Sequence, residues 1–281
     1  MKSITTYITE KMVYNKSNAN KIKYNYYPKT KEELKELLEQ LLKERGNDGD
    51  FNDIDTSEIT DMTGLFNYKH EFNGNISQWD VSKVTNMYSM FIGCKKFNQD
   101  ISKWDVSNVE NMHWMFNGCE SFNQPLKDWN VSKVTNMQCM FDDCKSFNQD
   151  ISKWNVSKVT NMDRMFMRYK SFNQPLNDWD VSNVTDMTCM FYFCESFNQL
   201  LNDWDVSNVN KMSSMFEKCK SFNQPLDKWN VSNVTDITEM FRESIFDKDI
   251  SNWKLNNNCD TKNMFKNSPL ARRQKKQPKI K

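Results

Sequence analysis

The 281-residue sequence is poor in the groups that most enzymes use. It has only two histidines, His70 and His113, and both occupy positions that vary between otherwise similar segments. It also contains no phosphate-binding loop, no nucleophile motif and no spacing of cysteines and histidines typical of a zinc site. The sequence therefore favours a protein that is not an enzyme and that needs no cofactor.

The chain also lacks an excess of charge and any long apolar run. Lys plus Arg total 38 and Asp plus Glu total 37, so the body has no field that would attract nucleic acid or an anionic membrane. No stretch approaches the length of a membrane span, and residues 1–27 lack a signal-peptide core and a lipid-attachment cysteine. We expect a cytoplasmic monomer; the alternative is association with a virion or a cell surface by a non-classical route.

What the sequence contains instead is a tandem repeat. Fixed self-similarity at such a period is typical of a solenoid, in which each unit buries its apolar side chains only against its neighbours. One elongated body is therefore expected. Seven tryptophans follow one another at intervals of 25 residues, and an eighth comes one residue early: Trp79, Trp104, Trp129, Trp154, Trp179, Trp204, Trp229 and Trp253.

Each repeat shows two apolar periods in succession. In residues 100–124, Trp104 and Val106 alternate with polar residues, which predicts a short strand with the tryptophan facing the core. The next apolar positions recur at the spacing of one helix face, which predicts a helix of about two turns. The predicted fold is thus an α/β solenoid, leucine-rich-repeat-like, with one short strand plus one short helix per 25-residue repeat. The helix positions are Met112, Met115, Phe116 and Cys119.

Other repeated positions are interpreted as structural. Pairs such as Thr85-Asn86 offer side-chain oxygens to the free N–H groups of the predicted helix. One column of asparagines could bond the backbone of the next coil. Five cysteines share a column in which Tyr169 and Ser244 also occur, so free buried thiols are expected there. These columns are Asn73, Asn98, Asn123, Asn148, Asn173, Asn198 and Asn223, and Cys94, Cys119, Cys144, Cys194 and Cys219.

The ends of the chain differ from its middle. A capping box at Thr30 to Glu33, a leucine stripe and a stop at Gly46 predict a helix within residues 28–49 that covers the first coil, although the stripe could instead form a dimer. Residues 1–27 are expected to be weakly ordered. Residues 50–268 form the repeats, seven full and one degenerate at each end. Residues 269–281 form a basic tail, expected to be solvated, with nucleic-acid docking as the alternative.

The predicted binding surface consists of the outward side chains beside each tryptophan, because a curved solenoid concentrates the residues of its concave strand face. Along much of this face acids and lysines alternate from coil to coil, so neighbours would pair. The predicted partner of this surface is a protein whose identity the sequence does not give. Its members are Lys103, Asp105, Asp128, Lys153, Asp178, Asp180, Asp203, Asp205 and Lys228.

The alternation fails once along this face. Asp178 then lies beside Asp203, and Asp180 and Asp205 follow two residues further along, so four carboxylates would gather within reach of a Ca²⁺ ion. The alternative is that the flanking Lys153 and Lys228 neutralise the patch. We therefore treat these four aspartates as candidate calcium ligands, or as a site for a basic segment of a partner.

The string W-D-V-S-x-V-T-N-M-x-x-M-F-x-x-C-x-x-F-N-Q, seen in residues 79–99, resembles the 25-residue repeat of mycoplasma-type, BspA-like leucine-rich surface proteins. The resemblance covers residues 51–265. It implies partner binding or adhesion and supplies no catalytic residues. The predicted function is a non-enzymatic scaffold for protein–protein interaction. The alternatives are a surface or virion-associated adhesin for glycan or host protein, and a nucleic-acid-docking protein that uses the basic tail.

Overall fold

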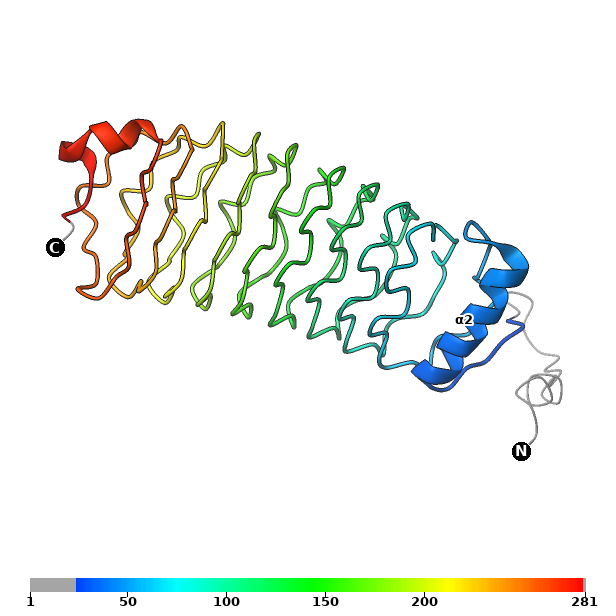
Figure 1. The fold of residues 1–281 in the computed structure, drawn as a ribbon. Helices are drawn as coiled ribbons and strands as arrows, with labels where there is room; N and C mark the ends of the chain where they lie inside the picture. The colour runs from blue at the N-terminus through cyan, green and yellow to red at the C-terminus, as the bar shows by residue number, and fades with distance from the viewer. Residues whose placement is uncertain (1–23, 280–281) are drawn as a thin grey trace.

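The computed structural model describes residues 24–279 and shows one elongated stack of coils, with the two ends of the described chain at opposite ends of the stack (Figure 1). Most of the segment expected to be weakly ordered, residues 1–23, lies outside the described residues. Within them the regular elements are one α-helix, α2 (Lys31–Arg45), and two short 3₁₀ helices, η1 (Pro269–Arg272) and η2 (Gln274–Lys276). Contacts of strand type occur there only as isolated parallel bridges between successive coils.

The prediction of one strand and one helix per repeat is therefore wrong. Where the helix was expected, the chain makes consecutive tight turns. The amide of Met115 donates to the carbonyl of Met112 at 3.1 Å, and that of Cys119 to Phe116 at 3.0 Å, which are i to i−3 bonds. Trp114 has φ 60° and Gly118 has φ 71°, values that an α-helix cannot contain.

Parallel backbone bonds between coils pass through this same segment. The amides of Met87, Ser89 and Phe91 donate at 2.9–3.0 Å to carbonyls of the next coil, those of Asn111, His113 and Met115. In the same way Gly93 donates to Asn117 at 2.7 Å. Because alternate N–H groups point to the next coil, they are not available for bonds within a helix. The apolar spacing fits both structures, since a run of turns also returns to the core every three or four residues. We call this the ladder side of the stack.

Where the strand was expected, two turns flank a short extended link. The amide of Trp104 donates to Ile101 at 3.1 Å, and that of Val109 to Val106 at 2.9 Å. The inward orientation of the tryptophan is as predicted: Trp104 is 3% exposed, and its indole N–H donates to the carbonyl of Ile76 in the preceding coil at 3.1 Å. Period-two alternation thus arises without a strand. We call this the Trp side.

Between the two sides lies one continuous apolar core built from stacked rings. Phe91 and Phe97 stack within a coil at 4.1 Å between centroids, and each stacks on its equivalent in the next coil, Phe116 at 5.7 Å and Phe122 at 5.8 Å. Identical residues at equivalent positions thus form columns along the whole stack. Offset aromatic pairs of this kind stabilise a fold beyond the area that they bury.

The cysteine and asparagine columns behave as expected. All eight cysteines are free, and the Sγ of Cys119 lies 3.0 Å from the carbonyl oxygen of Phe91. Burial raises the pKa of the Cys94 thiol to about 12, so the column stays protonated and unreactive. The side-chain oxygen of Asn98 accepts the amide of Asn123 at 2.9 Å, and the pattern continues from coil to coil.

Helix α2 lies across the first coil at the N-terminal end of the stack (Figure 1). The hydroxyl of Thr30 accepts the amide of Glu33 at 3.2 Å, and Gly46, with φ 76°, ends the helix. Its leucine stripe is buried in the same core as the coils, so the stripe has a partner within the chain. The buried leucines are Leu34, Leu37, Leu38 and Leu41.

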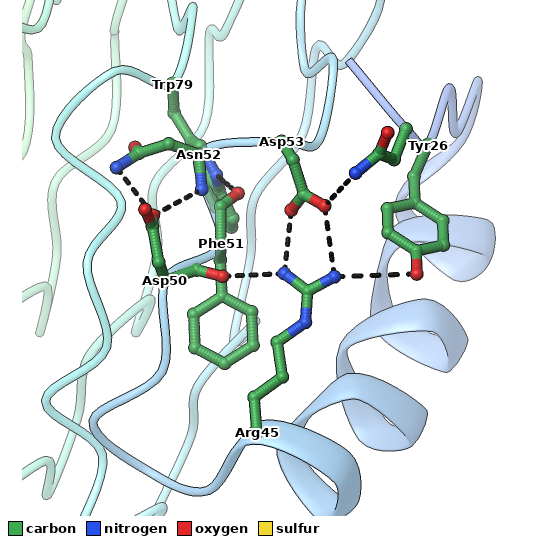
Figure 2. Close-up of polar contacts among 8 residues, drawn as sticks. Tyr26, Arg45, Asp50, Phe51, Asn52, Asp53 and Trp79 are labelled. Carbon is green, nitrogen blue, oxygen red and sulfur yellow. Dashed lines mark hydrogen bonds and ion pairs between the residues drawn. The ribbon is translucent and has the colours of Figure 1, made fainter. Parts of the chain in front are cut away.

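Arg45, the last residue of α2, ties the helix to the first coil (Figure 2). Its two terminal nitrogens bond the two carboxylate oxygens of Asp53 at 2.7 and 3.0 Å, and one of them also donates to the carbonyl of Asp50 at 2.6 Å. The guanidinium lies over the rings of Tyr26 and Phe51. A bidentate, partly buried pair of this kind fixes the angle at which the helix meets the stack.

The C-terminal segment, expected to be a solvated tail, packs partly on the last coils, while residues 271–275 are exposed. Leu270 is fully buried, and the amide of Ile250 donates to the carbonyl of Lys276 at 3.0 Å. Two of its basic residues contact Asp247, Arg273 at 2.6 Å and Lys276 at 3.6 Å. The segment therefore packs on the last coils instead of projecting from them.

Candidate binding surfaces

The outward residues predicted as a binding surface lie on the Trp side, and all nine are exposed. Lys153 bonds Asp178 at 3.2 Å, and Lys228 bonds Asp203 at 2.7 Å. Asp178 is therefore paired with a lysine of the preceding coil, and Asp203 with a lysine of the following coil. The face is an alternating polar surface rather than a concentrated acidic patch.

The proposed calcium ligands are engaged in local bonds. Asp180 Oδ1 accepts the amide of Ser182 at 3.1 Å, and Asp205 Oδ1 accepts the amide of Ser207 at 3.0 Å. Across residues 24–279 no three His, Cys, Asp or Glu side chains are grouped so that they could hold a metal ion. The geometry thus gives the calcium hypothesis no support.

A second surface, which the sequence analysis missed, lies on the ladder side. In the central coils, two residues between the two buried methionines and two between the buried phenylalanine and the cysteine column lie outside the core cluster. The second and fourth of these have positive φ. We call these positions the variable surface. In the central five coils they are His113, Trp114, Asn117 and Gly118; Gln138, Cys139, Asp142 and Asp143; Asp163, Arg164, Met167 and Arg168; Thr188, Cys189, Tyr192 and Phe193; and Ser213, Ser214, Glu217 and Lys218.

The signal for this surface is present within the chain. The core positions that alternate with it are nearly always Met, Met, Phe and Cys, whereas the variable surface changes in size, charge and aromatic character at almost every coil. A predicted helix assigns such positions to an ordinary solvated face, so the apolar spacing by itself does not reveal this surface. Once the segment is a ladder between coils, these side chains form parallel rows on one side of the stack.

A groove with a volume of about 400 Å³ opens in the middle of the variable surface, where three successive coils contribute to it. Phe193 and Tyr192 supply aromatic surface, and Arg168 supplies an exposed guanidinium. The ammonium of Lys170 lies 5.5 Å from the centroid of the Phe193 ring. The residues that line the groove are Asp143, Lys145, Arg168, Lys170, Ser171, Tyr192 and Phe193.

Lysines around the groove contact neighbouring acids to different degrees. Lys145 lies 2.8 Å from Glu120 and 3.8 Å from Asp143, whereas Lys170 reaches Glu195 only at 3.9 Å. On the adjoining coil, Lys218 donates to the hydroxyl of Tyr192 at 3.2 Å and so holds that ring in place. The groove therefore combines a positioned aromatic surface with cationic groups that are not fully neutralised.

Three carboxyl groups of the variable surface are buried. Burial raises the pKa of Asp142 to about 6, and it also raises the pKa values of Asp163 and Glu217. Asp142 accepts a bond from Asn117 at 3.2 Å, and Asp163 accepts bonds from Gln138 and Arg164, each at 2.8 Å. The hydroxyl of Ser214 donates to the carboxylate of Glu217 at 2.7 Å, so each of the three carboxyls is held by a neighbouring polar side chain.

Comparison with known families gives one match. The model described as "Mycoplasma protein of unknown function, DUF285" matches residues 33–145, 102–199 and 177–277, which together span most of the chain. No curated protein matches the sequence. In residues 24–279 no helix has both the length and the apolarity needed to cross a bilayer.

Proposed function

Because the chain belongs to a family of Mycoplasma proteins of unknown function, DUF285, we propose from its geometry that it is a non-enzymatic repeat scaffold that binds a protein partner through its variable surface. One observation carries this proposal. Core positions repeat almost unchanged from coil to coil, while the positions between them that lie outside the core cluster differ in nearly every coil. A scaffold that only had to fold would need no such diversity.

The composition of the variable surface supports protein recognition. Trp, Tyr and Arg are the residues that most often dominate binding energy at protein interfaces. Trp114, Tyr192, Arg164 and Arg168 all lie on this surface. Backbone bonds on every coil keep the rows in register, so binding costs little ordering of the main chain. Several coils can contact an extended partner at once.

The Trp-side residues predicted from the sequence form a second, weaker candidate for the partner surface. Their charges are partly satisfied by one another, as in the Lys153–Asp178 pair, and exposed pairs of this kind contribute little binding energy. The concave strand face to which they were assigned has no counterpart here, because the described residues form no strand. Docking of nucleic acid by the C-terminal segment has less support, since Arg273 and Lys276 already contact Asp247.

We propose a reducing, cytoplasmic location, supported by the eight free cysteines. The finer resemblance to BspA-like surface proteins would place the same variable surface outside a cell, facing a host protein or glycan. The two locations imply different partners for one scaffold. Fractionation of the native host with an antibody against the chain distinguishes them.

The proposed function is tested by comparing which partner proteins the parent and two matched variants retain. One variant changes Trp114, Arg164 and Tyr192 to Ser on the variable surface; the other changes Asp178, Asp180 and Asp203 to Ser on the Trp side. Each is immobilised and exposed to native host lysate and to host-surface proteins. We expect a reproducible protein partner to be retained by the parent and by the Trp-side variant, and lost from the variable-surface variant. Loss only from the Trp-side variant, or no partner at all, contradicts the proposal.

A further inference from the structure

We infer that the groove on the variable surface binds an acidic peptide segment, with a peptide carboxylate on Arg168 and an adjoining apolar side chain against Phe193 and Tyr192. The inference rests on the proposed function and specifies the chemistry of the partner. The charges of the lining residues and the size of the groove support it.

Charge is the first argument. Three of the lining residues are cationic, Lys145, Arg168 and Lys170, and one, Asp143, is anionic. Among the described residues Arg168 takes part in no ion pair and no side-chain hydrogen bond, whereas Arg45, Arg164 and Arg242 are all paired. Its positive charge acts on the carboxyl of Asp142, which is buried. An exposed, planar and unpaired guanidinium is suited to a carboxylate from outside the chain.

The backbone conformation of three lining residues allows a clean test of the groove. Asp143, Arg168 and Phe193 occupy one column and have φ values of 57°, 59° and 61°. Glycine adopts this conformation without penalty, and earlier coils use Gly93 and Gly118 in the same column. A bulky side chain there costs on the order of 1 kcal/mol. Tyr68, Lys218 and Glu243 share this column and its positive φ outside the groove, so the strain belongs to the stack as a whole. Its use is in the test, because a glycine substitution at Arg168 or Phe193 removes the side chain without adding backbone strain.

Size and the pattern of charge favour a peptide over a polyanion. A volume of about 400 Å³ falls within the range of small binding pockets, and it suits two or three side chains. Carboxylates of Asp143, Glu120 and Glu195 lie among the cations, and they would repel a continuous phosphate backbone. A peptide that alternates carboxylate and apolar side chains places each group against its complement.

The test uses the full chain and a fluorescein-labelled pentapeptide in which three glutamates alternate with two phenylalanines, and binding is followed by fluorescence anisotropy. The reference peptide replaces the glutamates by glutamine. The variants are Arg168→Gly and Phe193→Gly, because glycine relieves the positive φ and should leave the melting temperature unchanged or higher. Matched controls are Tyr68→Gly, in the same column at φ 54°, and Lys158→Ala, which removes one exposed positive charge on the Trp side.

We expect the parent and both controls to bind the acidic peptide, more weakly as salt rises, and the reference peptide at least roughly tenfold more weakly. Each groove variant should lose roughly tenfold or more in affinity with no loss of thermal stability. The inference is overturned if the parent does not prefer the acidic peptide, if both groove variants bind like the parent, or if an oligothymidylate binds more tightly than the peptide. Retention of a protein partner through the variable surface, together with such a result, would leave the proposed function intact.

Discussion

The two sides of each coil are joined to their neighbours by different means. On the ladder side the backbone makes the bonds, as from Phe91 to Met115 and from Phe116 to Met140, each at 3.0 Å. On the Trp side many of the bonds come from side chains, as from Trp104 to Ile76 at 3.1 Å and from Asn108 to Ser82 at 2.7 Å. Side chains that hold the stack together cannot vary freely, whereas those carried by a backbone ladder can. This difference explains why diversity accumulates on the ladder side.

The largest expected effect on stability comes from removing one indole on the Trp side. Trp154→Ala should destabilise the fold by about 3 to 5 kcal/mol, because it leaves a cavity in the ring columns and removes the bond to the carbonyl of Leu126, now 2.9 Å long. Urea denaturation followed by circular dichroism measures the loss. A variant as stable as the parent would show that the Trp side does not hold the coils together.

At the N-terminal end the first coil contacts helix α2 instead of another coil, and there a side-chain ion pair makes the connection. Arg45→Ala should cost about 2 to 3 kcal/mol, because it removes the bidentate contact with Asp53 and leaves that partly buried carboxylate without its cation (Figure 2). Denaturant midpoints at neutral pH report the change. Gln40→Ala, which removes an exposed bond to Glu44, is the control and should have a much smaller effect.

This contact also has a pH dependence. Burial raises the pKa of Asp53, but bonds from Arg45 and Asn25 outweigh it and hold the pKa below its usual value. A lowered pKa in the folded state adds stability above the unfolded pKa, about 4, and that stability is lost as pH falls below it. The difference between parent and Arg45→Ala should therefore shrink below about pH 4. A constant difference between pH 3 and pH 7 would contradict this account.

On the ladder side, Asp142→Asn tests whether the variable surface is retained at a cost in stability. The pKa of Asp142 is raised to about 6, so ionisation opposes folding, and stability falls as pH rises from about 4 to 6. The variant should be more stable than the parent by roughly 2 kcal/mol at pH 7 and nearly equal at pH 4. Melting temperatures across this range provide the measurement; a variant less stable at pH 7 would mean that the carboxylate is stabilising.

The smallest effect compares one outer position on each side. Asn183→Ala removes the bond to the carbonyl of Ser157, 2.8 Å long, and should cost about 0.5 to 1 kcal/mol. Ser213→Ala, on the variable surface, removes no side-chain bond of the described structure and should be neutral. Equal costs for the two, measured by chemical denaturation, would remove the distinction between the sides.

Local patterns were enough to predict a large part of this fold. The period, the buried columns, the asparagine bonds and helix α2 all depend on residue type and spacing within one or two repeats. The capping box at Thr30 and the stop at Gly46 are local signals of the same kind. The variable surface could not be predicted for the same reason that the helix was predicted wrongly: a helix would place the variable positions on an ordinary solvated face.

The sequence by itself determined which residues are buried and how often they recur, because burial follows from apolar spacing along the chain. Only the tertiary structure decided the backbone between those residues. At Trp114 or Phe193 the positive φ is imposed by amides that bond the neighbouring coil, an interaction some 24 residues distant. The groove has the same origin, since Lys145, Arg168 and Phe193 are brought together by stacking. A spacing that fits both a helix and a series of turns cannot distinguish them until the neighbouring coil supplies the bonds.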